Sequence, residues 1–225
     1  MKSDCPAGAG AEMKGDTMAG TGKRIPLVGV LMALLAQAVA LAPAKTAQSE
    51  AERLVEVLAL QPGMTVAEVG AGDGAMAVDV ARRLGSGAFY ATEIEQAKVD
   101  RIAEAGRSAG LERITAMRGE AAATGLPAEC CDAIYMRRVY HHFTDAAAMN
   151  RSLFEALKPG GRLAVVDFPP NNTWRRPSGV SHSRGGHGMP ADLLIKELEA
   201  AGFRFEQRID DWTGREYCVI VTKPR

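Results

Sequence analysis

The fold of this chain can be inferred from one stretch, Val66-Ala67-Glu68-Val69-Gly70-Ala71-Gly72-Asp73-Gly74. Its first four residues form a short, mostly apolar run, which is typical of a buried strand. The glycines that follow predict a tight turn, because glycine readily adopts positive φ and has no side chain to keep a ligand from the backbone. Residues 75–84 then show helical spacing and end at Gly85. A strand, a glycine-rich turn and a helix in this order predict one unit of a parallel sheet.

Strands and helices alternate through the rest of the chain, which predicts a Rossmann-like, doubly wound α/β fold with helices on both faces. The first helix begins at Ser49, a predicted N-cap with Glu52 as its capping-box partner. The last two strands have no helix between them, so we expect a mostly parallel, seven-stranded sheet with an antiparallel last strand. The expected strands are 64–69, 88–92, 114–118, 132–136, 162–168, 203–209 and 217–222, and the later helices are 95–109, 145–157 and 190–201.

The composition favours a small-molecule partner. The 225 residues include 27 basic and 27 acidic side chains, whereas a nucleic-acid-binding protein usually has a basic excess. We therefore expect no nucleic acid. Cys130, Cys131 and Cys218 lack the spacing of a disulfide framework or a complete zinc site, and we expect no bound metal.

The N-terminal part differs from the rest. Residues 25–44 contain no charged side chain, Lys23 and Arg24 precede them, and Ala38-Val39-Ala40 is a small-residue cleavage sequence. This layout predicts a signal peptide or an N-terminal membrane anchor over residues 1–44, followed by a folded domain over 45–225. The protein would then be exported to the periplasm or associated with a membrane through residues 25–44. The alternative is a cytoplasmic protein with an Ala-rich helix packed on its domain.

An acid at the end of the second predicted strand adds a binding function. Glu93 follows Gly70 by 23 residues, and a carboxylate there can accept hydrogen bonds from ribose hydroxyls. We expect Glu93 to lie outside the core. Gly70, Gly72 and Ala75 also satisfy the pattern of nicotinamide binding, so an NAD(P)-dependent oxidoreductase is an alternative. Glu68, just before the first glycine, disfavours a pyrophosphate and favours a ligand with an ammonium and a sulfonium group.

Four motifs in order resemble those of the class I S-adenosylmethionine-dependent methyltransferases, over residues 50–225. Residues 68–74 look like their E/D-x-G-x-G-x-G motif, and Glu93 matches the acid that binds ribose. Residues 119–121 are similar to the segment that contacts adenine, and residues 157–163 to the turn before the fifth strand. The resemblance implies S-adenosyl-L-methionine as cofactor and methyl transfer as activity. The implied cofactor-binding residues are Glu68, Gly70, Ala71, Gly72, Glu93, Ile94, Glu120, Ala121 and Arg137.

The methyl acceptor is expected beside the histidines. Tyr140-His141-His142-Phe143, Asp167-Phe168 and His187 resemble a group of bacterial predicted methyltransferases whose members often carry a signal-like leader. These residues follow the fourth and fifth strands, at the edge of the sheet where ligands bind. Because histidine titrates near neutral pH, we predict His141 and His142 as catalytic residues. Tyr140, Asp167 and His187 are the predicted substrate contacts. The alternatives are histidines that only pack or cap, and a protein that binds the cofactor without catalysis.

Overall fold

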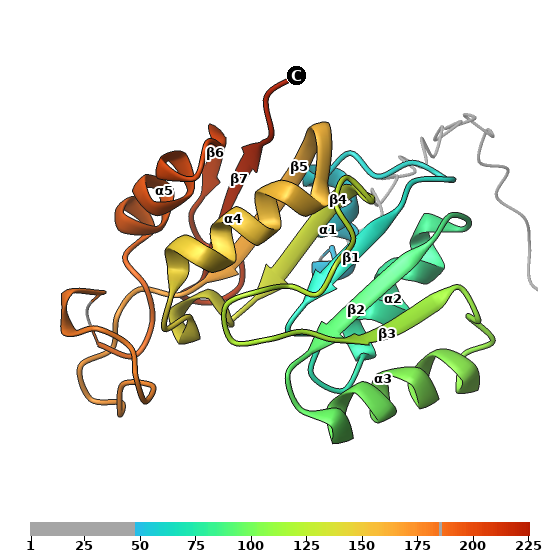
Figure 1. Cartoon of the computed structure of the whole chain (residues 1–225), viewed down its shortest axis with the longest axis horizontal. Coiled ribbons are helices and arrows are strands. Elements are labelled where there is room, and N and C mark those ends of the chain that lie inside the picture. Colours follow the sequence, from blue (N-terminus) through green and yellow to red (C-terminus); the bar gives the residue numbers. More distant parts are fainter. Residues whose placement is uncertain (1–47, 185) are drawn as a thin grey trace, which may run out of the picture. The chain divides into compact units, whose positions relative to one another are not determined.

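The computed structural model describes residues 48–184 and 186–225. It contains a seven-stranded sheet in the order β3-β2-β1-β4-β5-β7-β6 (Figure 1). Only β7 runs against its neighbours, because it pairs antiparallel with both β5 and β6 while the other pairs are parallel. The predicted fold is therefore confirmed. The strands are β1 (Val66–Val69), β2 (Phe89–Glu93), β3 (Ile114–Arg118), β4 (Cys131–Arg137), β5 (Leu157–Asp167), β6 (Arg204–Ile209) and β7 (Tyr217–Thr222).

Helices cover both faces of the sheet, with α1 and α2 on one face and α4 and α5 on the other (Figure 1). The two faces follow from alternation along each strand. In β4, Tyr135 packs into the core under α1 and α2, and Ile134 packs into the core under α4 and α5. The helices are α1 (Glu50–Val57), α2 (Ala75–Leu84), α3 (Gln96–Ser108), α4 (Ala146–Ala156) and α5 (Ala191–Ala200), with short 3-10 helices η1 (Tyr140–His142) and η2 (His182–Arg184).

The first helix begins as the sequence predicts. The Ser49 hydroxyl accepts a hydrogen bond from the Glu52 amide at 3.2 Å, and the Ser49 amide donates to the Glu52 carboxylate at 2.8 Å. These two bonds satisfy backbone groups that a helix start otherwise leaves unpaired. Ala51 and Leu54 are the fully buried residues of α1, so the helix is part of the core.

The fifth strand differs from the prediction because it begins at Leu157 instead of residue 162. Leu157 pairs with Cys131, and the register shifts before the next pair. Residues after β7 hold this irregular segment in the sheet. The Gly160 amide donates to Lys223 O at 2.8 Å, and the Lys223 amide donates to Gly161 O at 2.9 Å.

The predicted leader over residues 1–44 lies outside the described residues. Among residues 48–184 and 186–225, no helix has the length and apolar character that a bilayer crossing requires.

Candidate functional site

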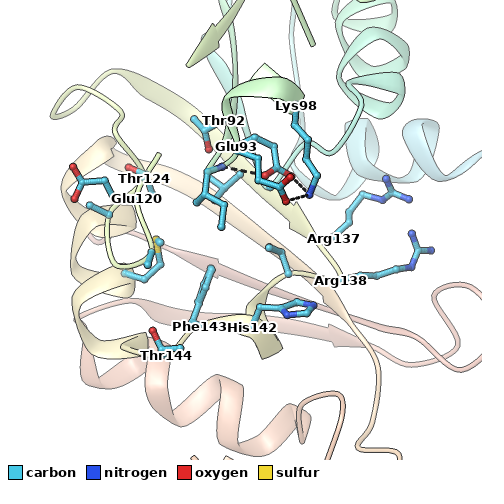
Figure 2. A pocket seen from close by; sticks show the side chains of 18 residues that line it. Thr92, Glu93, Lys98, Glu120, Thr124, Arg137, Arg138, His142, Phe143 and Thr144 are labelled. Atoms are coloured by element: carbon cyan, nitrogen blue, oxygen red, sulfur yellow. Dashed lines mark hydrogen bonds and ion pairs between the residues drawn. The ribbon is translucent and has the colours of Figure 1, made fainter. Parts of the chain in front are cut away.

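A cavity of about 520 Å³ opens at the carboxyl ends of β1, β2 and β4. This volume falls in the range of small-molecule pockets, roughly 300–1,000 Å³. In Figure 2, Glu93 and Lys98 lie at one end of the cavity, His142 lies at the other, and Glu120 lies to one side. The four segments in which the sequence predicts cofactor contacts thus meet at one site: the glycine turn, the end of β2, the segment after β3 and the end of β4.

The start of the glycine turn, at Val69 and Gly70, lines the cavity, and the glycines of the turn have different roles. Gly70 has φ +74°, and a Cβ there would lie 2.7 Å from a Val139 methyl group, so the position requires glycine for packing. Gly72 has φ +62°, but an added Cβ would meet nothing within 4 Å. Gly72 thus borders open space, but neither Ala71 nor Gly72 lines the cavity. The turn fits a bound cofactor that approaches the backbone closely.

Glu93 connects the turn to the second strand. One carboxylate oxygen accepts a hydrogen bond from the Gly72 amide at 3.0 Å, and the other accepts from the Ile94 amide at 3.1 Å. Lys98 Nζ lies 3.9 Å from the same carboxylate. Glu93 is only 9% exposed, so the expectation that it lies outside the core was wrong. It lines the cavity while it holds the turn, and a carboxylate has further lone pairs for ligand hydroxyls.

Glu68, a predicted cofactor contact, is buried and does not line the cavity. The side chain is 2% exposed, and the Tyr135 hydroxyl donates to its carboxyl group at 3.0 Å. Burial raises the pKa of Glu68 to about 8, although the positive charge of Arg137 acts in the opposite direction. The surroundings of Glu68 therefore favour its protonated, neutral form.

The segment after β3 forms the side of the cavity where the sequence predicts adenine. Glu120 and Ala121 are exposed and line this side. The Gly119 amide donates to Glu93 O at 3.0 Å, which ties the segment to the end of β2. Ile94 is 54% exposed and also faces the cavity, as an apolar surface for a planar ring.

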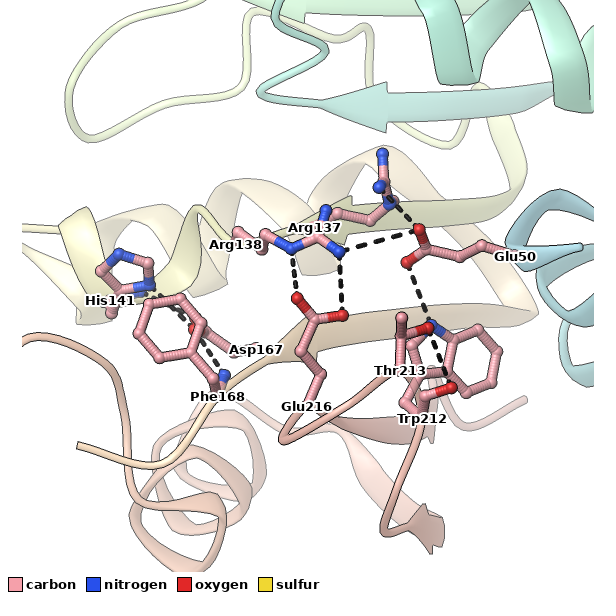
Figure 3. A network of polar contacts seen from close by, with 9 residues as sticks. All are labelled: Glu50, Arg137, Arg138, His141, Asp167, Phe168, Trp212, Thr213 and Glu216. Atoms are coloured by element: carbon pink, nitrogen blue, oxygen red, sulfur yellow. Dashed lines mark hydrogen bonds and ion pairs between the residues drawn. The ribbon is translucent and has the colours of Figure 1, made fainter. Parts of the chain in front are cut away.

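Two arginines from the end of β4 line the cavity but are already paired (Figure 3). Arg137 donates to Glu50 at 2.7 Å, and Arg138 forms a two-pronged contact with Glu216. Burial alone would raise the pKa of Glu50, but the hydrogen bond and charge of Arg137 outweigh it and lower that pKa. The cofactor contact of Arg137 stays a prediction.

The predicted acceptor residues divide into two groups. His142 lines the cavity, and burial together with the neighbouring His141 and His187 lowers its pKa. Tyr140 and Asp167 are fully buried and do not line the cavity. The Tyr140 hydroxyl donates to Glu197 at 2.9 Å and accepts from Asn150 at 2.8 Å, so these bonds within the core explain its position without a substrate.

Asp167 reaches the site only through a neighbour. Its carboxylate accepts a hydrogen bond from the His141 amide at 3.1 Å and lies 2.8 Å from His141 Nδ1.

Sequence reasoning did not single out Lys98 or Glu50. Lys98 lies within the first turn of α3, directly after the acid-bearing end of β2, and this position was a usable signal.

Comparison with known proteins agrees with this geometry. Residues 66–161 match a family described as "Methyltransferase domain", and they contain the turn, Glu93 and residues 119–121. Residues 66–161 are thus similar in sequence to a methyltransferase domain. Its fold is similar to that of a SAM-dependent methyltransferase from Aquifex aeolicus, with a TM-score of 0.65 and 22% identity, over 77% of this chain and 89% of the other.

Two curated proteins are similar to the methyltransferase domain in sequence. The sterol 24-C-methyltransferase of Yarrowia lipolytica is 26% identical over 164 residues, which are 68% of this chain and 42% of that protein. The uncharacterized protein YafE of Escherichia coli is 32% identical over 136 residues, 60% of this chain and 58% of that protein. The chain thus spans about half the length of these relatives.

Proposed function

We propose that the protein transfers a methyl group from S-adenosyl-L-methionine to a small-molecule acceptor. The observation that carries this proposal is the meeting of Gly70, Glu93 and Glu120 around one cavity that also contains His142. When bound, the cofactor would supply a sulfonium methyl group, which the acceptor takes in line as the carbon–sulfur bond breaks and S-adenosylhomocysteine leaves.

Each end of the cavity suits one part of the cofactor. Glu93 can accept hydrogen bonds from the ribose hydroxyls, as a carboxylate at this strand end does in related sheets. We expect Glu120 and Ala121 to contact the adenine, and the start of the turn at Gly70 to lie near the methionine end. The acceptor then occupies the end near His142, because the other end is used by the cofactor.

The residues on the acceptor side align the acceptor, which is the main requirement of an in-line displacement. His142 is the histidine that lines the cavity, so its ring can contact an acceptor. The catalytic roles of His141 and His142 remain predictions. Binding without turnover would support the non-catalytic alternative.

The first test is cofactor binding. Calorimetry should show that the protein binds S-adenosylmethionine and S-adenosylhomocysteine but not NAD or NADP. Glu93→Gln keeps the size of the side chain but removes its charge, at a cost of about 1.5–3 kcal/mol, roughly a tenfold to hundredfold weaker Kd for both ligands. Glu112→Gln, an exposed control outside the cavity, should bind like the wild type.

Glu93 also holds the turn, so the melting temperature of each variant must be measured without ligand. Wild-type affinity in Glu93→Gln would show that the ribose assignment is wrong. Binding of NAD without S-adenosylhomocysteine would refute the cofactor itself. A screen with methyl-labelled cofactor across hydroxyl, thiol, amine and carboxylate acceptors then tests transfer.

A further inference from the structure

Three histidines from two distant segments converge beside the cavity. His141 and His142 belong to η1, which follows β4, and His187 lies between β5 and α5. One ring nitrogen from each histidine can be chosen so that all three lie within 4.8 Å of one another. The ring centroids of His141 and His142 are 4.2 Å apart, and those of His141 and His187 are 4.9 Å apart.

The His141 ring is oriented by a buried carboxylate. Its Nδ1 lies 2.8 Å from Asp167, and because a carboxylate accepts hydrogen bonds, Nδ1 carries the hydrogen (Figure 3). In the neutral ring, Nε2 then holds a lone pair. This Nε2 is buried and has no hydrogen-bond partner among the described residues. Buried polar atoms are normally paired, so His141 Nε2 is an unexplained acceptor.

The His187 ring is oriented in the same way. Its Nδ1 lies 2.7 Å from the backbone carbonyl oxygen of Arg175 and must donate to it, so Nε2 holds the lone pair of the neutral ring. An isolated bridge between Asn171 and His187 fixes the backbone at this position. A carboxylate or a backbone carbonyl on the second ring nitrogen is the arrangement typical of metal-binding histidines.

The surroundings of the cluster suit a site with one open position. Phe168 stacks on His187 with its ring 5.8 Å away, and Trp174 contacts the same ring edge-on at 5.5 Å. These aromatic rings cover one side of the cluster. On another side His142 lines the cavity, so a ligand in the cavity can reach the cluster.

We propose that His141, His142 and His187 bind a divalent transition metal, with Zn²⁺ as the best fit. Three histidines and one open position form a common set of ligands for catalytic zinc, at about 2.0–2.1 Å from the metal. The three nitrogens lie within 4.8 Å of one another and must move closer together to reach this geometry. The buried Asp167 carboxylate supplies negative charge beside the ion. Lys98, a positive charge that also lines the cavity, is paired with Glu95 at 2.9 Å, which reduces its repulsion of a cation.

The metal deepens the proposed function, and its role toward the acceptor rests on that function. An ion at this place binds an acceptor through a hydroxyl, thiol or carboxylate group and favours the deprotonated form of a hydroxyl or thiol. The substrate class is therefore a molecule with such a group at the methylated atom or next to it. Histidine side chains would serve as ligands in this arrangement and not as free bases.

The experiment measures metal binding on the full chain after removal of metals with a chelator. Titration with Zn²⁺ against a chromophoric chelator should give one strong site per chain, and Co²⁺ should give the intense visible absorption of a four-coordinate site. His142→Ala and His187→Ala should each weaken Zn²⁺ at least 100-fold. His182→Ala is the matched control, because His182 is exposed in the same segment and pairs with Arg176, and it should bind like the wild type.

Asp167→Asn tests the positioning of His141 and should weaken Zn²⁺ by about 10- to 100-fold while shifting the Co²⁺ spectrum. The proposal is overturned if no stoichiometric Zn²⁺ binds, or if His142→Ala and His187→Ala bind it as tightly as His182→Ala. Zinc held by Cys130 and Cys131 would give that second result.

Calorimetry with S-adenosylhomocysteine on the same samples separates the two proposals. If the protein binds S-adenosylhomocysteine but does not bind Zn²⁺, the metal site alone is refuted. If it binds Zn²⁺ but not S-adenosylhomocysteine, the methyltransferase function alone is refuted. His141→Ala removes a buried ring and can unfold the protein, so the decision rests on His142 and His187, whose variants must keep the wild-type melting temperature within a few degrees.

Discussion

Glu68 is a carboxyl group buried next to the glycine turn, and its neutral form is the stable one in the fold. Burial raises the pKa to about 8, whereas the unfolded chain has the ordinary value near 4.5. Between these two values the native protein keeps a proton that the unfolded chain loses. The contribution of Glu68 to the free energy of unfolding is therefore fully present below pH 4.5 and is lost as the pH rises toward 8.

Replacing Glu68 by Gln should remove this pH dependence. Each unit of pKa difference corresponds to about 1.4 kcal/mol, so the stability of the wild type relative to Glu68→Gln should fall steadily from pH 5 to 8 and then level off. Urea unfolding of the ligand-free protein at several pH values measures this difference. The exposed Glu112→Gln serves as control and should follow the wild type. Parallel curves for Glu68→Gln and the wild type would show that Glu68 is ionised in the fold.

Individual site residues were predictable where they belong to the turn or to a strand end. Gly70, Glu93 and Glu120 line the cavity because parallel strands place their carboxyl ends at one edge, whereas Glu68 is buried beside it. Residues just beyond a strand end were less predictable, since the chain turns there and the strand period no longer gives side-chain direction. For this reason Tyr140 lies in the core although it precedes two histidines of the site.

At the scale of elements, α1 supports the site from outside the matched family region. Its first turn carries Glu50, which pairs with Arg137 and accepts a hydrogen bond from the Trp212 indole at 3.1 Å (Figure 3). The capping box at Ser49 fixes where this turn begins. Local helix chemistry thus positions a side chain that orders one wall of the cavity.

Removal of the cap should therefore affect stability and the site together. Ser49→Ala should cost about 1 kcal/mol, since an N-cap hydroxyl is typically worth 0.5–2 kcal/mol. Thermal unfolding measures this loss, and the exposed Ser86→Ala between α2 and β2 is the control, with an expected change near zero. A Ser49→Ala variant as stable as Ser86→Ala would contradict the role of the capping box.

Element boundaries were predictable where glycine marks them locally. The predicted and observed ranges agree for α2, which lies between Gly74 and Gly85. The start of β5 was not predictable, because Lys223 from the far end of the chain holds Gly160 and Gly161 in the sheet. The same reason applies to the histidine cluster. The segment that carries His187 has no periodic pattern, so its approach to His141 depends on tertiary contacts.

At the scale of the whole molecule, the two faces of the sheet carry separate cores that share the strands. Ala51 and Leu54 of α1 belong to the core on one face, so the folded domain must include this helix. A fully buried leucine contributes about 1.5–3 kcal/mol, a large share of the stability of an ordinary domain. The domain thus needs α1 although the family match begins at residue 66.

We propose that residues 1–44 direct the protein out of the cytoplasm or to a membrane and are dispensable for folding. A chain that begins at Lys45 retains the Ser49 cap and both cores, so it should be soluble, melt like the full chain and bind S-adenosylhomocysteine with unchanged affinity. A chain that begins at Leu60 lacks α1 and should melt at least several degrees lower, with weaker binding, because Arg137 loses Glu50. If the Lys45 chain is insoluble or fails to bind, the N-terminal residues pack on the domain.

Mass spectrometry of the protein from its native cells should find an N-terminus just after Ala40 if the leader is cleaved. An intact start would favour an anchor or a cytoplasmic protein.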